Sequence, residues 1–174
     1  MKPVTESQCL LETPYFNVVR ENGYFIIKEA RAINGVVAVP TLEDGRLMLV
    51  NLKRRAIGGM SIEFPRGAID ENETACDAAA RELLEETGWQ ALKVKELGLL
   101  HSNTSLIASA VAVCQVYLDT QATDATDGEV DDLLFITRQE LMAMITAGQI
   151  TDGHTLSAAM MLIASEAGLP SPPL

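Results

Sequence analysis

The stretch Gly67 to Trp89, GAIDENETACDAAARELLEETGW, decides how this chain folds. Its middle is rich in alanine, leucine and glutamate, which are strong helix formers. Thr74 is a typical N-cap residue, and Gly88 is a typical residue for ending a helix. The pattern therefore predicts a helix from Thr74 to Thr87, entered through a loop that starts at Gly67.

Three carboxylates share one side of this predicted helix. Glu82, Glu85 and Glu86 fall within an arc of about 100° at helical spacing. Like charges three and four residues apart repel by a few tenths of a kcal/mol per pair, and a divalent cation reverses that sign. Mg²⁺ and Mn²⁺ prefer oxygen ligands, and no cluster of Cys or His suits a softer metal. The spacing thus indicates a Mg²⁺ (or Mn²⁺) site, with a solvated acidic helix face as the alternative.

The segment also resembles the signature of the Nudix hydrolases, G-x5-E-x7-R-E-U-x-E-E-x-G-U, where U is a bulky apolar residue. The residues at its fixed positions are Gly67, Glu73, Arg81, Glu82, Leu83, Glu85, Glu86, Gly88 and Trp89. A chance match in a chain of this length has a frequency of roughly 10⁻⁷ at ordinary residue usage. Trp89 stands where the family usually has Ile, Leu or Val, a departure that concerns packing.

The resemblance implies a fold and a set of site residues. The fold is α/β, a Nudix α/β/α sandwich with a central mixed sheet and an N-terminal antiparallel hairpin. The expected metal ligands are Glu82, Glu85, Glu86 and the backbone carbonyl of Arg66. Arg81 is expected to orient the glutamates, with Glu85 as a partner four residues on. Gly67 is expected to allow the tight backbone path that turns the Arg66 carbonyl toward the metal.

The implied reaction is metal-dependent hydrolysis of a pyrophosphate bond by water. The signature from Gly67 to Trp89 is called the box below. The sequence that leads into it, Glu63-Phe64-Pro65-Arg66-Gly67, resembles that of ADP-ribose and nucleoside-diphosphate-sugar pyrophosphatases. The products would then be a nucleoside monophosphate and a sugar phosphate. Two alternatives stay open: a nucleoside triphosphate pyrophosphohydrolase, and a non-catalytic ligand-binding module of the same fold. The second is disfavoured because every box glutamate is present.

Residues outside the box are expected to contact the substrate. Arg54, Glu63 and Arg66 lie where this subgroup has its substrate-binding residues, and an arginine can bind a phosphate through two hydrogen bonds. A solvated basic turn is the alternative for Arg54. Members of the subgroup carry a proline soon after the box. This chain has no proline there and instead has the sequence HSNTSL, which begins at His101. This departure favours the wider nucleotide-sugar group, and His101 becomes a candidate contact or a structural residue.

A further catalytic acid is expected in the C-terminal part. The sequence from Asp131 to Ile163 resembles the same part of the subgroup, in which a loop before the last strand holds a catalytic glutamate. Alignment on that strand indicates Glu129. Asp131, Asp132 or a box glutamate could serve as the general base instead.

The remaining chain divides at composition changes. We predict N-terminal strands over 1–34, a Nudix domain over 35–167 and a frayed tail over 168–174, GLPSPPL. Val18 to Lys28 reads as a hairpin around Asn-Gly. The subgroup exchanges its N-terminal strands across a dimer, so a homodimer is expected. The nearby aromatic residues, which could stack on a base or pack in the interface, are Tyr15, Phe16, Tyr24 and Phe25.

Between the box and the tail, the sequence predicts strands at 94–101, 107–118 and 133–137, helices at 139–146 and 152–166, and a loop at 119–128. The chain has 13 Lys and Arg and 24 Asp and Glu, which gives a net charge of −11. This negative charge limits the partners that the protein can bind. Nucleic acids and anionic membranes bind positive surfaces and are therefore unlikely partners on this ground. The three scattered cysteines and the lack of an apolar signal predict a cytoplasmic protein.

Overall fold

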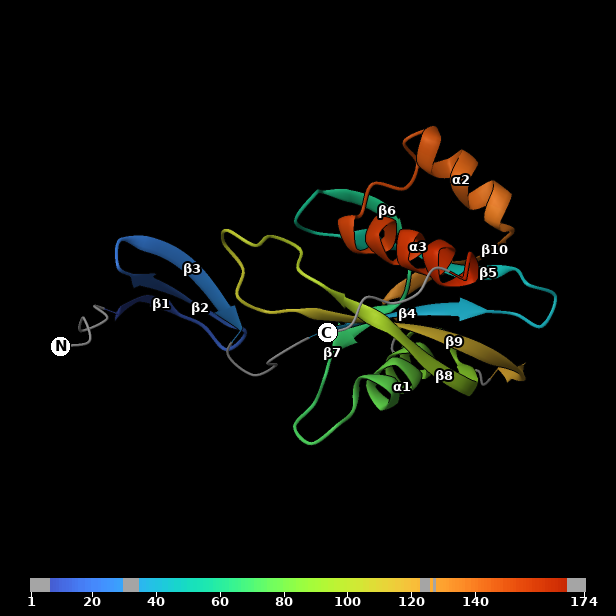
Figure 1. The fold of residues 1–174 in the computed structure, drawn as a ribbon, viewed down its shortest axis with the longest axis horizontal. Helices are drawn as coiled ribbons and strands as arrows, with labels where there is room; N and C mark the ends of the chain where they lie inside the picture. The colour runs from blue at the N-terminus through green and yellow to red at the C-terminus, as the bar shows by residue number, and fades with distance from the viewer. Residues whose placement is uncertain (1–6, 30–34, 123–125, 127, 169–174) are drawn as a thin grey trace.

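A seven-stranded mixed sheet forms the centre of the molecule, and helices cover both of its faces (Figure 1). The computed structural model describes residues 7–29, 35–122, 126 and 128–168. The strands of the sheet are β4 (Gly35–Thr41), β5 (Leu47–Arg54), β6 (Gly59–Glu63), β7 (Arg66–Ala68), β8 (Trp89–Leu100), β9 (Val111–Ala122) and β10 (Val130–Ile136). The helices are α1 (Ala75–Thr87), α2 (Arg138–Thr146) and α3 (Gly153–Glu166).

The strand order is β10-β5-β4-β9-β8, with β6 paired to β5 and β7 paired to β4. The β4–β9 pair is parallel, and the other pairs are antiparallel. Strand β4 is apolar throughout because both of its faces are covered. Val37 and Val39 join the core formed with α2 and α3, whereas Val36 and Ala38 join the core formed with α1. The predicted α/β/α sandwich with a central mixed sheet is confirmed.

A separate antiparallel sheet of β1 (Ser7–Glu12), β2 (Phe16–Glu21) and β3 (Tyr24–Glu29) lies beside this body. Asn22 and Gly23 turn between β2 and β3 with φ values of 50° and 90°, the left-handed values that a tight hairpin turn needs. The predicted hairpin is confirmed, and β1 lies within the region 1–34 predicted to hold N-terminal strands, although its position was not predicted. Ile27 joins this sheet to the main body, because its N–H donates to the Leu106 carbonyl at 2.7 Å and its carbonyl accepts from the Ala108 N–H at 3.0 Å.

Several element boundaries differ from the predictions. Strand β8 begins at Trp89 rather than at 94, and β10 begins at Val130 rather than at 133. Strand β9 begins at Val111 rather than at 107, since residues 106–108 hydrogen-bond to Ile27 instead. It also continues to Ala122 into the predicted loop 119–128, because Trp89 of β8 pairs with Ala122. Polar composition alone suggested a loop there, but a neighbouring strand supplies backbone partners. Residues 169–174 of the predicted tail lie outside the described residues, and no helix in the described part is long and apolar enough to cross a membrane.

Candidate active site

Helix α1 begins and ends at the residues that its sequence indicates. The Thr74 hydroxyl accepts a hydrogen bond from the Asp77 N–H at 3.2 Å, and Gly88 ends the helix in the left-handed conformation with φ 74°. Ala78, Ala79 and Leu83 are fully buried against the sheet. This packing fixes how the helix is rotated, and it places Glu86, one of the predicted metal ligands, in the interior at 6% exposure.

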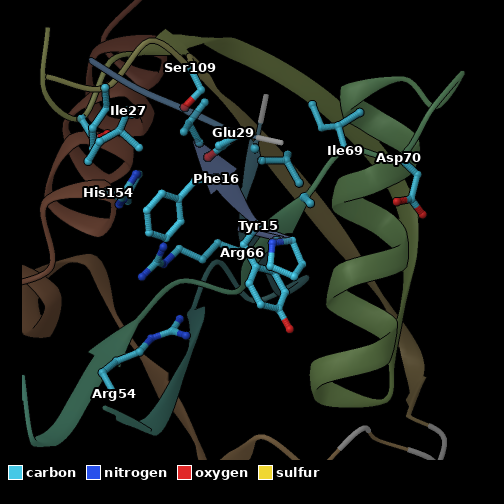
Figure 2. A pocket seen from close by; sticks show the side chains of 18 residues that line it. Tyr15, Phe16, Ile27, Glu29, Arg54, Arg66, Ile69, Asp70, Ser109 and His154 are labelled. Atoms are coloured by element: carbon cyan, nitrogen blue, oxygen red, sulfur yellow. The ribbon is translucent and has the colours of Figure 1, made fainter. Parts of the chain in front are cut away.

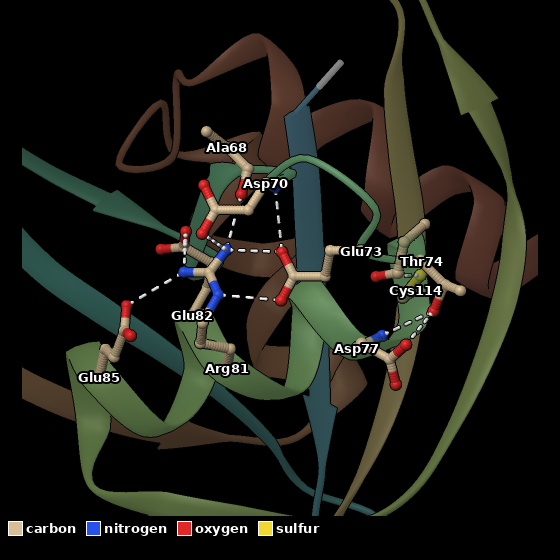
Figure 3. Close-up of polar contacts among 10 residues, drawn as sticks. Ala68, Asp70, Glu73, Thr74, Asp77, Arg81, Glu82, Glu85 and Cys114 are labelled. Carbon is tan, nitrogen blue, oxygen red and sulfur yellow. Dashed lines mark hydrogen bonds and ion pairs between the residues drawn. The ribbon is translucent and has the colours of Figure 1, made fainter. Parts of the chain in front are cut away.

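Arg81 is the centre of a polar cluster that joins α1 to the loop before it (Figure 3). Its Nε and Nη2 donate to the two carboxylate oxygens of Glu73, each at 2.9 Å, and Nη2 also donates to the Ala68 carbonyl at 2.9 Å. Its Nη1 donates to Glu82 at 2.8 Å and to Glu85 at 3.1 Å. These bonds, that to Glu73 first, raise the pKa of Arg81. The geometry includes the predicted Arg81–Glu85 pair, and it also ties the loop to the helix.

Gly67 is where the loop and the helix come closest. A Cβ atom at this position would lie 2.0–2.2 Å from the carboxylate carbon and oxygens of Glu82, far inside van der Waals contact. Gly67 is not among the glycines with positive φ. The glycine is therefore required for the space that the Glu82 carboxylate fills, whereas the sequence analysis explained it by an unusual backbone path.

The carboxylates of α1 have the chemistry of a site for a hard cation. Burial raises the pKa of Glu82, and the charge of Glu85 raises it further, although Arg81 acts in the opposite direction. A cation would relieve both effects, and all the side-chain donors are oxygens. In the described part of the chain, no three Asp, Glu, His or Cys side chains already converge as a metal site. Arg81 instead holds one oxygen of Glu82 and one of Glu85, so the three-glutamate ligand set stays a prediction.

A buried glutamate, Glu63, organises the arginines next to the box. Its side chain is 2% exposed and accepts from Arg54 Nη2 at 2.7 Å and from Arg66 Nε at 3.0 Å. Burial alone would raise the pKa of Glu63, but the hydrogen bonds from Arg54, Ser61 and Arg66 lower it overall. Three of the four residues predicted to bind substrate therefore form one cluster, in which Glu63 contacts both arginines.

The first turn of α3 packs against this cluster. Asp152 caps the helix, since its Oδ2 accepts from both the N–H and the hydroxyl of Thr155 at 2.8 Å. The Thr155 hydroxyl also accepts from the Phe64 N–H at 3.0 Å, which ties α3 to the segment before the box. The other oxygen of Asp152 lies 3.9 Å from Arg66 Nη2 and 3.7 Å from His154 Nδ1. Burial would raise the pKa of Asp152, but the nearby His154 ring, the hydrogen bonds from Thr155 and the charge of Arg66 lower it.

These elements surround a cavity of about 610 Å³, within the usual range for small-molecule sites (Figure 2). Gly67 to Asp70 form the wall on the side of α1, and Arg54, Arg66 and His154 extend from other sides. The N-terminal sheet closes the cavity with Tyr15, Phe16, Ile27 and Glu29. The box, the arginines and two aromatic rings thus border one space.

Two predicted site residues lie elsewhere. His101 is exposed, and its neighbour Ser102 lines the cavity instead. Glu129 is exposed just after the 119–128 segment. Among the described residues that line the cavity, neither His101 nor Glu129 is present. The sequence analysis did not single out His154 or Glu29. Glu29 carries no local signal, and the only hint for His154 is its place directly after the Asp-Gly that begins α3.

A second cavity, of about 960 Å³, lies at the opposite ends of β4 and β9. Trp89, Tyr117 and Arg138 are among its lining residues. Although it is the larger cavity, the described residues that line it include none of those predicted for the site. The smaller cavity beside Gly67 is therefore the candidate active site.

Comparisons with known proteins agree with this geometry. Residues 32–158 match the NUDIX domain family. An ADP-ribose pyrophosphatase of Bacillus subtilis (strain 168) is 23% identical over 137 residues, covering 76% of this chain and 74% of its own length. A GDP-mannose pyrophosphatase of Yersinia enterocolitica is 25% identical over 155 residues, covering 81% of each chain. The solved structure of an ADP compounds hydrolase has a TM-score of 0.77 at 19% identity, covers 97% of this chain and 96% of its own, and shows a shared fold.

Proposed function

The chain belongs to the Nudix family and is a Nudix pyrophosphohydrolase, and from this premise we propose that it cleaves nucleoside diphosphates linked to a sugar. ADP-ribose and the nucleoside-diphosphate sugars are the substrate class, and a nucleoside monophosphate and a sugar phosphate are the products. Relatives named as ADP-ribose and GDP-mannose pyrophosphatases support this class.

The observation that carries the proposal is the cavity next to Gly67. Its wall is the start of the box, with the Glu82 carboxylate directly behind Gly67. Arg54 and Arg66 supply hydrogen-bond donors for a diphosphate, and Tyr15 and Phe16 supply apolar rings for the rest of the substrate. A triphosphate has no second sugar to bury, whereas this cavity offers an extended apolar wall.

We assign the metal, Mg²⁺ or Mn²⁺, to Glu82, Glu85, Glu86 and the Arg66 carbonyl. When bound, such an ion activates the attacking water and offsets the charge of the phosphates. Arg81 holds Glu82 and Glu85 in place, and Glu63 holds Arg54 and Arg66 toward the substrate. Glu129 remains our candidate for the general base, with Asp131, Asp132 and the box glutamates as rivals.

A panel assay tests the proposal. ADP-ribose, GDP-mannose, ATP and GTP are each incubated with the protein and Mg²⁺ or Mn²⁺. For the two sugar nucleotides, alkaline phosphatase then releases phosphate from any monoester product. For ATP and GTP, which alkaline phosphatase cleaves directly, inorganic pyrophosphatase is used instead and releases phosphate from any diphosphate product. We expect metal-dependent release from the two sugar nucleotides, and loss of that release in Glu86→Gln. Absence of turnover of every nucleoside diphosphate derivative, with metal present, would refute the proposed function. Turnover of the triphosphates alone would favour the alternative reaction.

We also propose that the protein is a cytoplasmic homodimer. The N-terminal sheet presents large apolar side chains to solvent, among them Leu11, Tyr24 and Phe25 at 50–74% exposure. Burying them against a second chain would be favourable, at about 25 cal/mol per Å² of apolar surface. Sedimentation velocity tests this assignment, since a monomer at micromolar concentration would contradict it. The free thiols of Cys9, Cys76 and Cys114 support a reducing compartment.

A further inference from the structure

His154 is a cavity residue to which the proposed mechanism gives no role. It lies in the first turn of α3, its side chain is 20% exposed, and it borders the same cavity as Arg54 and Arg66. Figure 2 shows its ring among the side chains that line the cavity, which include Phe16 and Arg66. Because Asp152 and Thr155 cap α3 without it, the position of His154 is not needed to form the helix.

The charges around the cavity leave a need that His154 can meet. Arg54 and Arg66 both pair with the buried carboxylate of Glu63, and Asp152 lies close to Arg66. The two guanidinium charges are thus balanced by two carboxylates before any substrate enters. Glu86 also lies near enough for its charge to raise the pKa of Arg54. Arg54 and Arg66 can still donate to a diphosphate, but their charges are largely offset, so a further donor in the cavity would strengthen its binding.

His154 is oriented to be that donor. Its Nδ1 lies 3.7 Å from Asp152 Oδ1, so this face of the ring is turned toward the cap. The opposite nitrogen, Nε2, is then the one left to face the cavity. At 3.7 Å the contact with Asp152 is longer than a hydrogen bond, so the ring can carry its proton on Nε2 and donate it from there to an ionised phosphate. Such a charge-assisted bond is about twice as strong as a neutral one.

We propose that His154 binds the substrate directly, donating a hydrogen bond from Nε2 to a phosphate oxygen of the bound nucleoside diphosphate derivative. The inference rests on the proposed function, because it assumes a phosphate-containing ligand in this cavity. It makes His154 a specificity-determining residue for the diphosphate, held in place by Asp152. His101, the other histidine of the chain, was the contact expected from sequence.

Two substitutions separate a hydrogen-bonding role from a packing role. His154→Leu removes the donor and keeps much of the volume, whereas His154→Gln keeps an N–H donor. A hydrogen bond to a charged group corresponds to about a tenfold to hundredfold change in affinity. We expect His154→Leu to raise KM by that factor with kcat changed much less, and His154→Gln to recover a large part of the loss. A contact made equally in the bound substrate and the transition state produces this split.

Binding without turnover gives an independent readout, because the chain has only two histidines. In proton NMR of the unchanged protein with EDTA, the two imidazole signals are followed as ADP-ribose or GDP-mannose is added. The signal absent from His154→Gln, or retained in His101→Gln, belongs to His154. We expect that signal to move on binding, with an Nε2 nitrogen shift typical of a ring nitrogen that carries a proton.

Each outcome is decisive. If calorimetry detects binding while the His154 signal does not move, or only that of His101 moves, the inference is wrong and the proposed function stands. Equal KM values for His154→Leu and the unchanged protein would also overturn it. If the unchanged protein neither binds nor hydrolyses either compound with Mg²⁺ or Mn²⁺, the proposed function fails and the inference fails with it.

Discussion

Replacing Gly67 by alanine should damage catalysis much more than folding. The new methyl group would lie 2.0 Å from the Glu82 carboxylate carbon and 2.1–2.2 Å from its oxygens. Non-bonded atoms need about 3.5 Å, so the carboxylate or the β7 strand must move by roughly 1.5 Å. Glu82 cannot move freely, because Arg81 Nη1 holds one of its oxygens at 2.8 Å.

A misplacement of about 1 Å in a catalytic group can reduce the rate by about 100-fold, equivalent to about 2.7 kcal/mol. Overpacking typically costs about 1–3 kcal/mol of stability. We therefore expect kcat for GDP-mannose or ADP-ribose with Mg²⁺ to fall by about 100-fold in Gly67→Ala. Urea unfolding should show a protein that is destabilised and still folded. Both quantities are measured on the same preparation.

Gly59→Ala is the matched control, because a Cβ at Gly59 would meet nothing within 4 Å and its φ is not positive. It should leave kcat and stability close to those of the unchanged protein. If Gly67→Ala kept kcat within about threefold of the control, the position of the Glu82 carboxylate would not limit the reaction. The reasoning from the Gly67–Glu82 contact would then be refuted.

Three further outcomes follow from the same site. Glu86→Gln should reduce Mg²⁺-dependent turnover by at least about 100-fold while thermal unfolding changes little; near-normal turnover would exclude Glu86 as a ligand. Arg54→Ala should lower the free energy of unfolding, measured in urea, by about 3 kcal/mol, because the buried Glu63 carboxylate is then paired with Arg66 alone. A decrease of less than about 1 kcal/mol would contradict this expectation. The pKa values of Glu63 and Asp152 are lowered in the folded state. Both carboxylates therefore stabilise the fold at pH values above their unfolded-state pKa values of about 4.3 and 3.9. This stabilisation is lost as the pH falls through their lower folded-state pKa values. Urea midpoints from pH 7 down to pH 3 should therefore fall less steeply in Glu63→Gln than in the unchanged protein.

The sequence predicted those features that depend on local chemistry. Thr74 and Gly88 bound α1 where expected, and the Asn22–Gly23 turn joins a hairpin. Each depends on the backbone preference of a single residue, which the sequence displays directly. The helical period predicted one shared side for Glu82, Glu85 and Glu86, but packing buries Glu86 and leaves Glu85 exposed, so their convergence on one metal stays a prediction.

Features that depend on distant partners could not be predicted in the same way. His154 borders the cavity because α3 packs on the segment before the box through the Thr155–Phe64 bond, which spans 91 residues. The end of β9 likewise depends on a partner in β8. Gly67 is a case in between: its identity was recognised, but the reason for it, the Glu82 carboxylate, became clear only from the packed helix.

The cavity has two origins along the chain. The residues that hold the reaction chemistry belong to the part matching the family domain, 32–158, whereas Tyr15, Phe16, Ile27 and Glu29 come from strands that precede it. Under the proposed function, mutations in residues 7–29 would alter which sugar or base is admitted without changing the box. Selectivity and hydrolysis can therefore diverge independently in evolution, and residues 7–29 are the natural segment to exchange between relatives when a new substrate preference is sought.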